Sequence, residues 1–159
     1  MVVAAVALPL LLTFLLALLD IGRVVFLAAE TDTAAHAVRC LVEAQAESAS
    51  RPGDLDRSAR EASPSLGGEG LELDIVASVG EVERREYGHK LFDGKERAFF
   101  ERSAQVSTRP LEVTVSVRGY YLTPVGALIA QASGVPDASF SCKAHVRGLV
   151  DETIEGGVW

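Results

Sequence analysis

The sequence lacks the usual motifs of catalysis and of nucleotide binding. It has no Gly-x-Ser-x-Gly motif, and its Gly67-Gly68 pair is not followed by the lysine and helix of a phosphate-binding loop. Histidine and cysteine are scarce, with three and two residues, and no internal repeat is present. We therefore expect no catalytic residues, no cofactor and no bound metal, and we predict that the protein is not an enzyme.

An excess of basic residues is also missing. The chain has 22 acidic and 15 basic residues, which gives a net charge of −7. Binding to the phosphates of a nucleic acid depends on clustered lysine and arginine side chains. The composition therefore excludes a nucleic acid as the expected partner.

Charge is absent altogether from residues 1–19, and almost every residue there is apolar. A helix of this length rises about 28 Å, close to the hydrocarbon thickness of a bilayer, about 30 Å. The first charged side chain is Asp20 and the first cation is Arg23. We interpret residues 1–19 as a membrane-spanning helix, with everything after Arg23 held at one face of the membrane.

Three other interpretations of this apolar run compete with a membrane span. A cleaved signal peptide has a shorter apolar region, about 7–15 residues, and no small-x-small cleavage site precedes Asp20. A buried helix of a soluble core rarely stays apolar on all sides. A helix that leaves the bilayer to pack among copies of itself has the same composition, so this alternative remains open.

The rest of the chain changes from helical to strand periodicity. One helix is predicted from the membrane span to about residue 50, with Pro9 kinking or loosening it and residues 24–49 amphipathic. Residues 51–69 are rich in Ser, Gly and Pro and predict a linker loop, with a short turn of helix at 54–61. Beyond it we predict strands at 71–79, 82–92, 96–108, 111–122 and 138–150, a turn at Asp93-Gly94, and a helix at 123–132.

These elements predict an α+β fold, in which a long N-terminal helix packs on a small antiparallel β-sheet. A sheet with one apolar face needs a cover, and the amphipathic half of the helix is the candidate. The predicted divisions are a transmembrane and amphipathic helix at 1–50, the linker loop at 51–69 and a β-rich head at 70–159.

Three stretches resemble a known family. They are the apolar run containing Leu8-Pro9, the step Asp20-Ile21-Gly22-Arg23, and the alanine-rich helix that follows. Together these residues, about 1–48, resemble the TadE-like family, the minor pilins or pseudopilins of tight-adherence (Flp-type) pilus systems. Residues 113–128, VTVSVRGYYLTPVGAL, are similar to the distal part of such proteins. One departure is Val3, where the family carries a glutamate; with no leader before Met1, we expect either an upstream start or insertion without peptidase processing.

The resemblance implies a structural subunit with one membrane span and an extracytoplasmic head, which assembles into a pilus or secretion machine. Its implied partners are other pilin or pseudopilin subunits, the inner-membrane assembly platform and membrane lipid. A membrane-anchored binding or sensor domain that never assembles is the alternative. Small residues let helices approach closely, and the predicted packing and assembly set is Ala4, Ala5, Ala7, Pro9, Ala17, Asp20, Gly22 and Arg23.

The two cysteines, Cys40 and Cys142, are predicted to form a disulfide. Cys40 lies late in the amphipathic helix and Cys142 lies on the apolar face of the last strand, so docking of the helix on the sheet brings these faces together. Two unpaired buried thiols are the second interpretation. A zinc site that adds His36 and His145 is the third, although Cys142 and His145 point to opposite faces of one strand.

Overall fold

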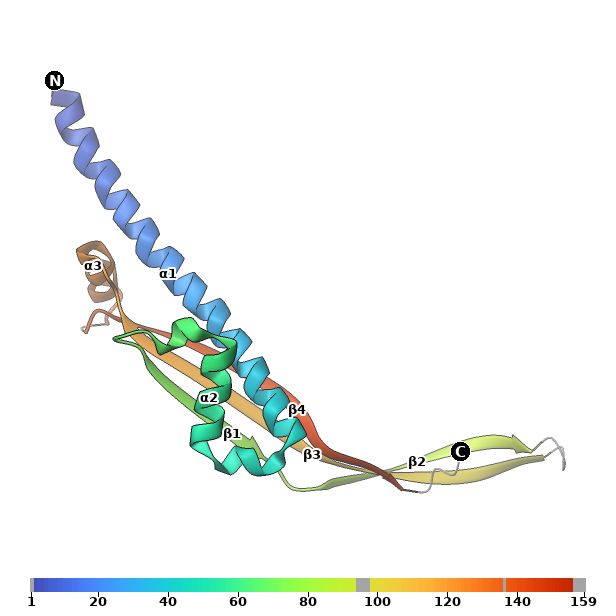
Figure 1. The fold of residues 1–159 in the computed structure, drawn as a ribbon. Coiled ribbons are helices and arrows are strands. Elements are labelled where there is room, and N and C mark those ends of the chain that lie inside the picture. Colours follow the sequence, from blue (N-terminus) through green and yellow to red (C-terminus); the bar gives the residue numbers. More distant parts are fainter. Residues whose placement is uncertain (1, 94–97, 136, 156–159) are drawn as a thin grey trace.

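The computed structural model describes residues 2–93, 98–135 and 137–155. One long helix crosses one face of a small antiparallel sheet, and a shorter helix lies beside it on the same face (Figure 1). The predicted α+β fold, a long N-terminal helix packed on a small antiparallel sheet, is thereby confirmed.

Helix α1 runs without interruption from Val2 to Ala44. Its 43 residues give a rise of about 64 Å. The helix continues past Pro9, and Figure 1 shows one unbroken coil there. It ends earlier than the predicted residue 50, because Gln45 leaves the helical region with φ −144° and a 3₁₀ helix, η1, follows at Ala46–Ser50.

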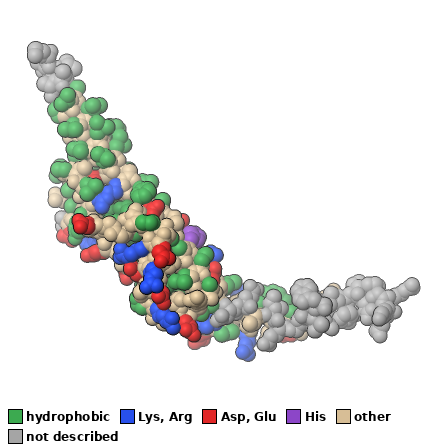
Figure 2. Space-filling view, viewed as in Figure 1, with side chains coloured by type: hydrophobic (Ala, Val, Ile, Leu, Met, Phe, Trp, Pro, Cys, Tyr) green, Lys and Arg blue, Asp and Glu red, His purple; other side chains and the backbone are tan. Residues whose placement is uncertain are grey.

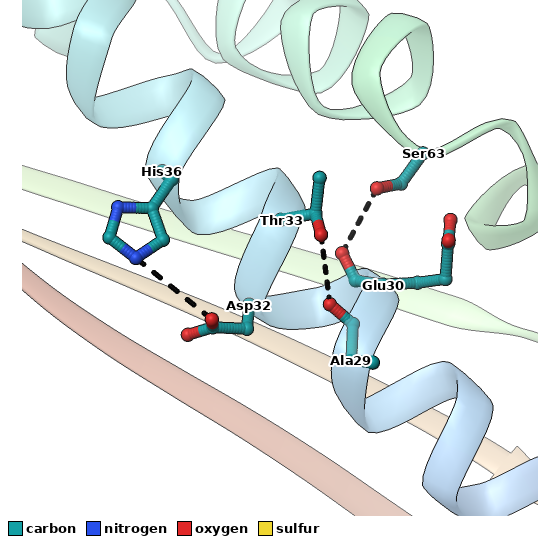
Figure 3. A network of polar contacts seen from close by, with 6 residues as sticks. All are labelled: Ala29, Glu30, Asp32, Thr33, His36 and Ser63. Atoms are coloured by element: carbon teal, nitrogen blue, oxygen red, sulfur yellow. Dashed lines mark hydrogen bonds and ion pairs between the residues drawn. The ribbon is translucent and has the colours of Figure 1, made fainter.

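The segment predicted as a linker loop, 51–69, is more helical than expected, although the short turn of helix predicted at 54–61 is present. It contains α2, Pro52–Ala62, and the 3₁₀ helix η2, Pro64–Gly67. Proline suits the first turn of a helix, and the two buried apolar residues of α2, Leu55 and Ala59, are four residues apart and so share one face. This face packs toward α1, and Ser63 Oγ donates a hydrogen bond to the backbone carbonyl of Glu30 at 3.0 Å (Figure 3).

Four antiparallel strands form the sheet: β1 (Glu72–Val79), β2 (Glu83–Asp93), β3 (Ala98–Tyr120) and β4 (Ser139–Glu155). Strand β3 is central. It pairs with β2 and then β1 along one edge, and with β4 along the other. The first half of β3 and β2 extend away from α1 as a two-stranded arm (Figure 1). Residue 94 of the predicted Asp93-Gly94 turn lies outside the described residues.

Strand β3 replaces two predicted strands, 96–108 and 111–122. Pro110, which lacks an N–H group, suggests a break, but its carbonyl accepts a hydrogen bond from Gly80 N at 2.8 Å and the strand continues. The irregularity is confined to a register shift against β4 between Ser107 and Arg109.

The core lies between α1 and the sheet. Alternate residues of β3, Val113, Val115 and Val117, are completely buried, and their cross-strand partners on β4 are Val146, Ala144 and Cys142. Helix α1 contributes Ala34, Ala35, Val38 and Val42. The opposite face of the sheet is polar and carries ion pairs such as Arg147–Glu112, 3.1 Å. The amphipathic half of α1 therefore covers the sheet as predicted.

Candidate functional site

The N-terminal part of α1 stands clear of the head and is apolar on its surface. Leu8, Leu10, Leu11 and Phe14 are each more than half exposed, and Figure 2 shows hydrophobic side chains around this end of the molecule. The helix is long and apolar enough to cross a membrane. Of the predicted packing residues, Ala7 and Pro9 are exposed and Ala17 is half-buried, whereas the side chains of Ala4 and Ala5 lie outside the described part.

Asp20, directly after the apolar run, is only 2% exposed. Its carboxylate accepts three hydrogen bonds from the segment before helix α3 (Pro124–Ala132). Leu122 N donates to Oδ1 at 3.0 Å, while Thr123 N and Thr123 Oγ1 donate to Oδ2 at 3.3 and 2.5 Å. The predicted role of Asp20 in packing against another subunit is therefore corrected, because its own head encloses this side chain.

Arg23 binds the same segment from the next turn of α1. Its Nη1 donates to the Tyr120 carbonyl at 2.7 Å, and its guanidinium lies 5.5 Å from the ring centre of Phe140. Tyr121 meets the same ring edge to face, with centroids 5.6 Å apart. Residues three apart on a helix share one face, so Asp20 and Arg23 together fasten α1 to the end of β3. We call this contact the α1–α3 junction: Asp20 and Arg23 with Tyr120, Leu122 and Thr123.

The junction also fixes where α3 begins. Thr123 Oγ1 accepts a hydrogen bond from Gly126 N at 3.2 Å and so caps the first turn of α3. A Cβ at residue 126 would overlap the Asp20 carboxylate and lie 2.8 Å from Tyr121 Cδ1. Glycine at 126 therefore permits this close approach, whereas Gly22, two residues after Asp20 on α1, has open space around it.

The predicted disulfide is wrong, because Cys40 and Cys142 are both free. Cys142 is buried and its Sγ donates to the Val24 carbonyl at 3.7 Å. Val24 precedes Cys40 by more than four helical turns, about 24 Å along the axis. Cys40 is exposed on α1, so the alternative of two buried thiols fits only Cys142.

Thiol labelling checks this arrangement. Burial raises the pKa of the Cys142 thiol, so less of it is the reactive thiolate at a given pH. We expect a maleimide at mildly alkaline pH to label Cys40 quickly in the folded protein and Cys142 only after denaturation, as measured by peptide mass spectrometry. The Cys40→Ser variant should take up no label when folded. A peptide pair linked through both cysteines would contradict the assignment.

Histidines and acidic residues do not form a metal centre in the described part of the chain, where no group of three metal-binding side chains occurs. His36 is exposed and faces Asp32, with Nε2 and Oδ2 3.9 Å apart (Figure 3). His145 lies on the outer face of the sheet, 3.1 Å from Thr114 Oγ1, opposite to the buried Cys142. The zinc interpretation therefore fails, because its four residues are not brought together.

A hollow at the base of the arm is lined by residues that include Arg85, Tyr87 and Leu149. Its volume is about 240 Å³, below the roughly 300–1,000 Å³ typical of ligand pockets. The features that stand out are thus the bare apolar helix and the α1–α3 junction. Comparison of this chain with protein-family models, with curated proteins and with solved structures finds no match.

Proposed function

We propose that the protein is a structural subunit that assembles through α1, a minor pilin or pseudopilin of a Flp-type pilus or secretion machine. In this proposal the helix is stored in the cytoplasmic membrane and the head lies outside the cytoplasm. Its partners are the helices of other subunits and the inner-membrane assembly platform.

The observation that carries the proposal is the division of one helix between two environments. Residues of α1 such as Leu11 and Phe14 are bare and apolar, whereas Val38 and Val42 of the same helix are completely buried in the head. A simple anchor needs only a span and a flexible tether. A continuous helix instead holds the head at a fixed angle to the span, which suits a subunit stacked in regular order with others.

Enlarging a small residue on the exposed helix tests assembly. Ala7 is exposed and lies far from the head, and small residues allow transmembrane helices to approach closely. We expect Ala7→Phe to lose most co-purification with neighbouring subunits in the native host, while the protein stays in the membrane fraction. Ala17 is less suitable, because it is half-buried near the head.

Leu10→Phe is the matched control. Leu10 is also exposed on this part of α1, but it is already large, so the change adds little bulk. We expect this variant to keep its partners. Unchanged association of Ala7→Phe, measured by quantitative mass spectrometry of the purified complex, would count against assembly through α1 and favour a simple membrane anchor.

A further inference from the structure

A second part of the chain is free of charge. Residues 119–136, which contain α3, include no acidic, basic or histidine residue. A charged residue stands at each end of this stretch, Arg118 before it and Asp137 after it, and these two pair with Nη2 and Oδ2 3.7 Å apart. Strand β3 ends at Tyr120 and β4 begins at Ser139. The described residues between the two members of this ion pair, 119–135, are therefore uncharged, and we call them the α3 excursion.

This excursion lies beside the membrane-spanning part of α1. Asp20 holds Leu122 and Thr123 at the start of α3, and α3 contacts α1. Leu16 and Ala17 are half-buried, in contrast to the exposed Leu15. Figure 1 shows α3 next to α1 at the end of the head nearest the N-terminus. The excursion is therefore level with the last turn of the apolar run.

The large exposed side chains of the excursion are mostly apolar. Leu122 is 73% exposed, Leu128 is 64% exposed, and Ile129 is about half exposed. Leu18 and Leu19, at the same level of α1, are exposed too. Soluble surfaces rarely leave such neighbouring apolar side chains in water, and here they continue the apolar surface of the span.

We propose that the α3 excursion is a second membrane contact, an interfacial helix inserted into the leaflet from which the head emerges. The distance from Leu16 to Asp20 is about 6 Å along the helix axis. This matches the depth of interfacial helices, about 5–10 Å into the boundary between headgroups and acyl chains. The head then rests on the membrane at two points, α1 and α3.

Lipid fits this surface better than a protein partner does. Leu18 and Leu19 of α1 and Leu128 of α3 are all exposed at the same end of the head, so lipid around an inserted α1 would also meet α3 without any further component. Tyr120, which is exposed, and Arg118 lie at the base of the excursion, and aromatic and cationic residues are enriched where proteins cross the membrane–water interface. This membrane contact requires that α1 is inserted in the membrane, but it does not require that the protein assembles into a filament. The membrane contact and the proposed assembly can therefore be tested separately.

Quenching by brominated lipid tests the contact in the full chain. Trp159 is the only tryptophan, so a Trp159→Phe background with Leu128→Trp carries one probe on α3. After reconstitution at low density in phosphatidylcholine vesicles, we expect lipid brominated near the carbonyl end of the acyl chain to reduce tryptophan emission strongly. Lipid brominated near the methyl end should reduce the emission less.

Two further variants support the interpretation. Leu122→Trp places a second probe on the excursion in case Leu128→Trp fails to fold, and it should be quenched similarly. Val76→Trp, exposed on the polar face of the sheet, should emit equally in all vesicles. Quenching of the α3 probes no greater than that of Val76→Trp would overturn the proposal. A blue-shifted tryptophan emission that brominated lipid does not quench, and whose intensity increases with the protein density in the vesicles, would also overturn it. A second copy of the protein would then cover α3.

Discussion

Replacing Asp20 with alanine is expected to release the α3 excursion from α1. The change removes a buried acceptor of three hydrogen bonds and leaves Leu122 N, Thr123 N and the Thr123 hydroxyl without it. Hydrogen bonds to a charged group contribute about 1.5–3 kcal/mol each, and stranded donors add a penalty. Even about 3 kcal/mol, the contribution of two such bonds at the low end of this range, corresponds to at least a roughly 100-fold loss of amide protection. Hydrogen exchange of residues 120–132 in the detergent-solubilised full chain measures it.

Three further variants test this expectation: Asp32→Ala and Gly22→Ala as controls, and Gly126→Ala as a second way to disturb the junction. Asp32→Ala removes an exposed carboxylate from the same helix, one that faces only His36 among the contacts described, and should leave this exchange unchanged. Gly126→Ala keeps the Asp20 carboxylate, but its methyl group would overlap that carboxylate, so it should also lower the amide protection of residues 120–132. Gly22→Ala has room for its methyl group and should leave this protection unchanged. Full protection of residues 120–132 in Asp20→Ala would show that the carboxylate does not hold the junction.

Two arginines in the apolar run are expected to abolish membrane insertion. Leu8 and Leu11 are exposed near the middle of the run, so the double variant Leu8→Arg, Leu11→Arg does not disturb the head. Each arginine near the centre of a span raises the free energy of membrane insertion by about 2.5–3.5 kcal/mol. The two arginines together cost more than several leucines contribute, since each leucine lowers this free energy by only about 0.3–0.6 kcal/mol. We expect the protein to move from the carbonate-resistant membrane pellet to the soluble or aggregated fraction.

Val76→Arg, on the outer face of the sheet, is the matched control for added positive charge and should remain in the pellet. If the double arginine variant also remains there, lipid does not surround this part of α1. The alternative in which the helix is buried among copies of itself would then explain its composition better than a membrane span.

The sequence predicted the elements whose periodicity is strong. Alternation of Val113, Val115 and Val117 with polar residues placed one face of β3 in the core, where all three are buried. The unbroken apolar and alanine-rich run predicted α1, because nothing but Pro9 and Gly22 opposes helix there. By contrast, α2 buries only Leu55 and Ala59. With so few apolar residues the sequence predicted no more than a short turn of helix at 54–61 within a polar loop.

The sequence could not predict contacts that depend on how far one element slides along another. Cys142 lies on the helix-facing side of β4, as predicted. The point on α1 that it contacts was not predicted, because its thiol meets the backbone of Val24 and not Cys40. Asp20 is conspicuous as the first charge after an apolar run. Two of its three partners are backbone amides about one hundred residues later. Every residue except proline has such an amide, so no side-chain pattern marks these two, and the third is the hydroxyl of Thr123.

The continuity of α1 fixes the direction in which the head points around the axis of the helix, relative to the exposed apolar end. Each residue of a helix turns the chain by about 100° and advances it about 1.5 Å. No joint separates the exposed leucines from the buried valines of α1, so the azimuth of the head is set by the number of residues between them. Inserting a single residue between Ala7 and Asp20 would lengthen the molecule hardly at all, yet it would swing the whole sheet and its arm about a quarter-turn around the helix axis.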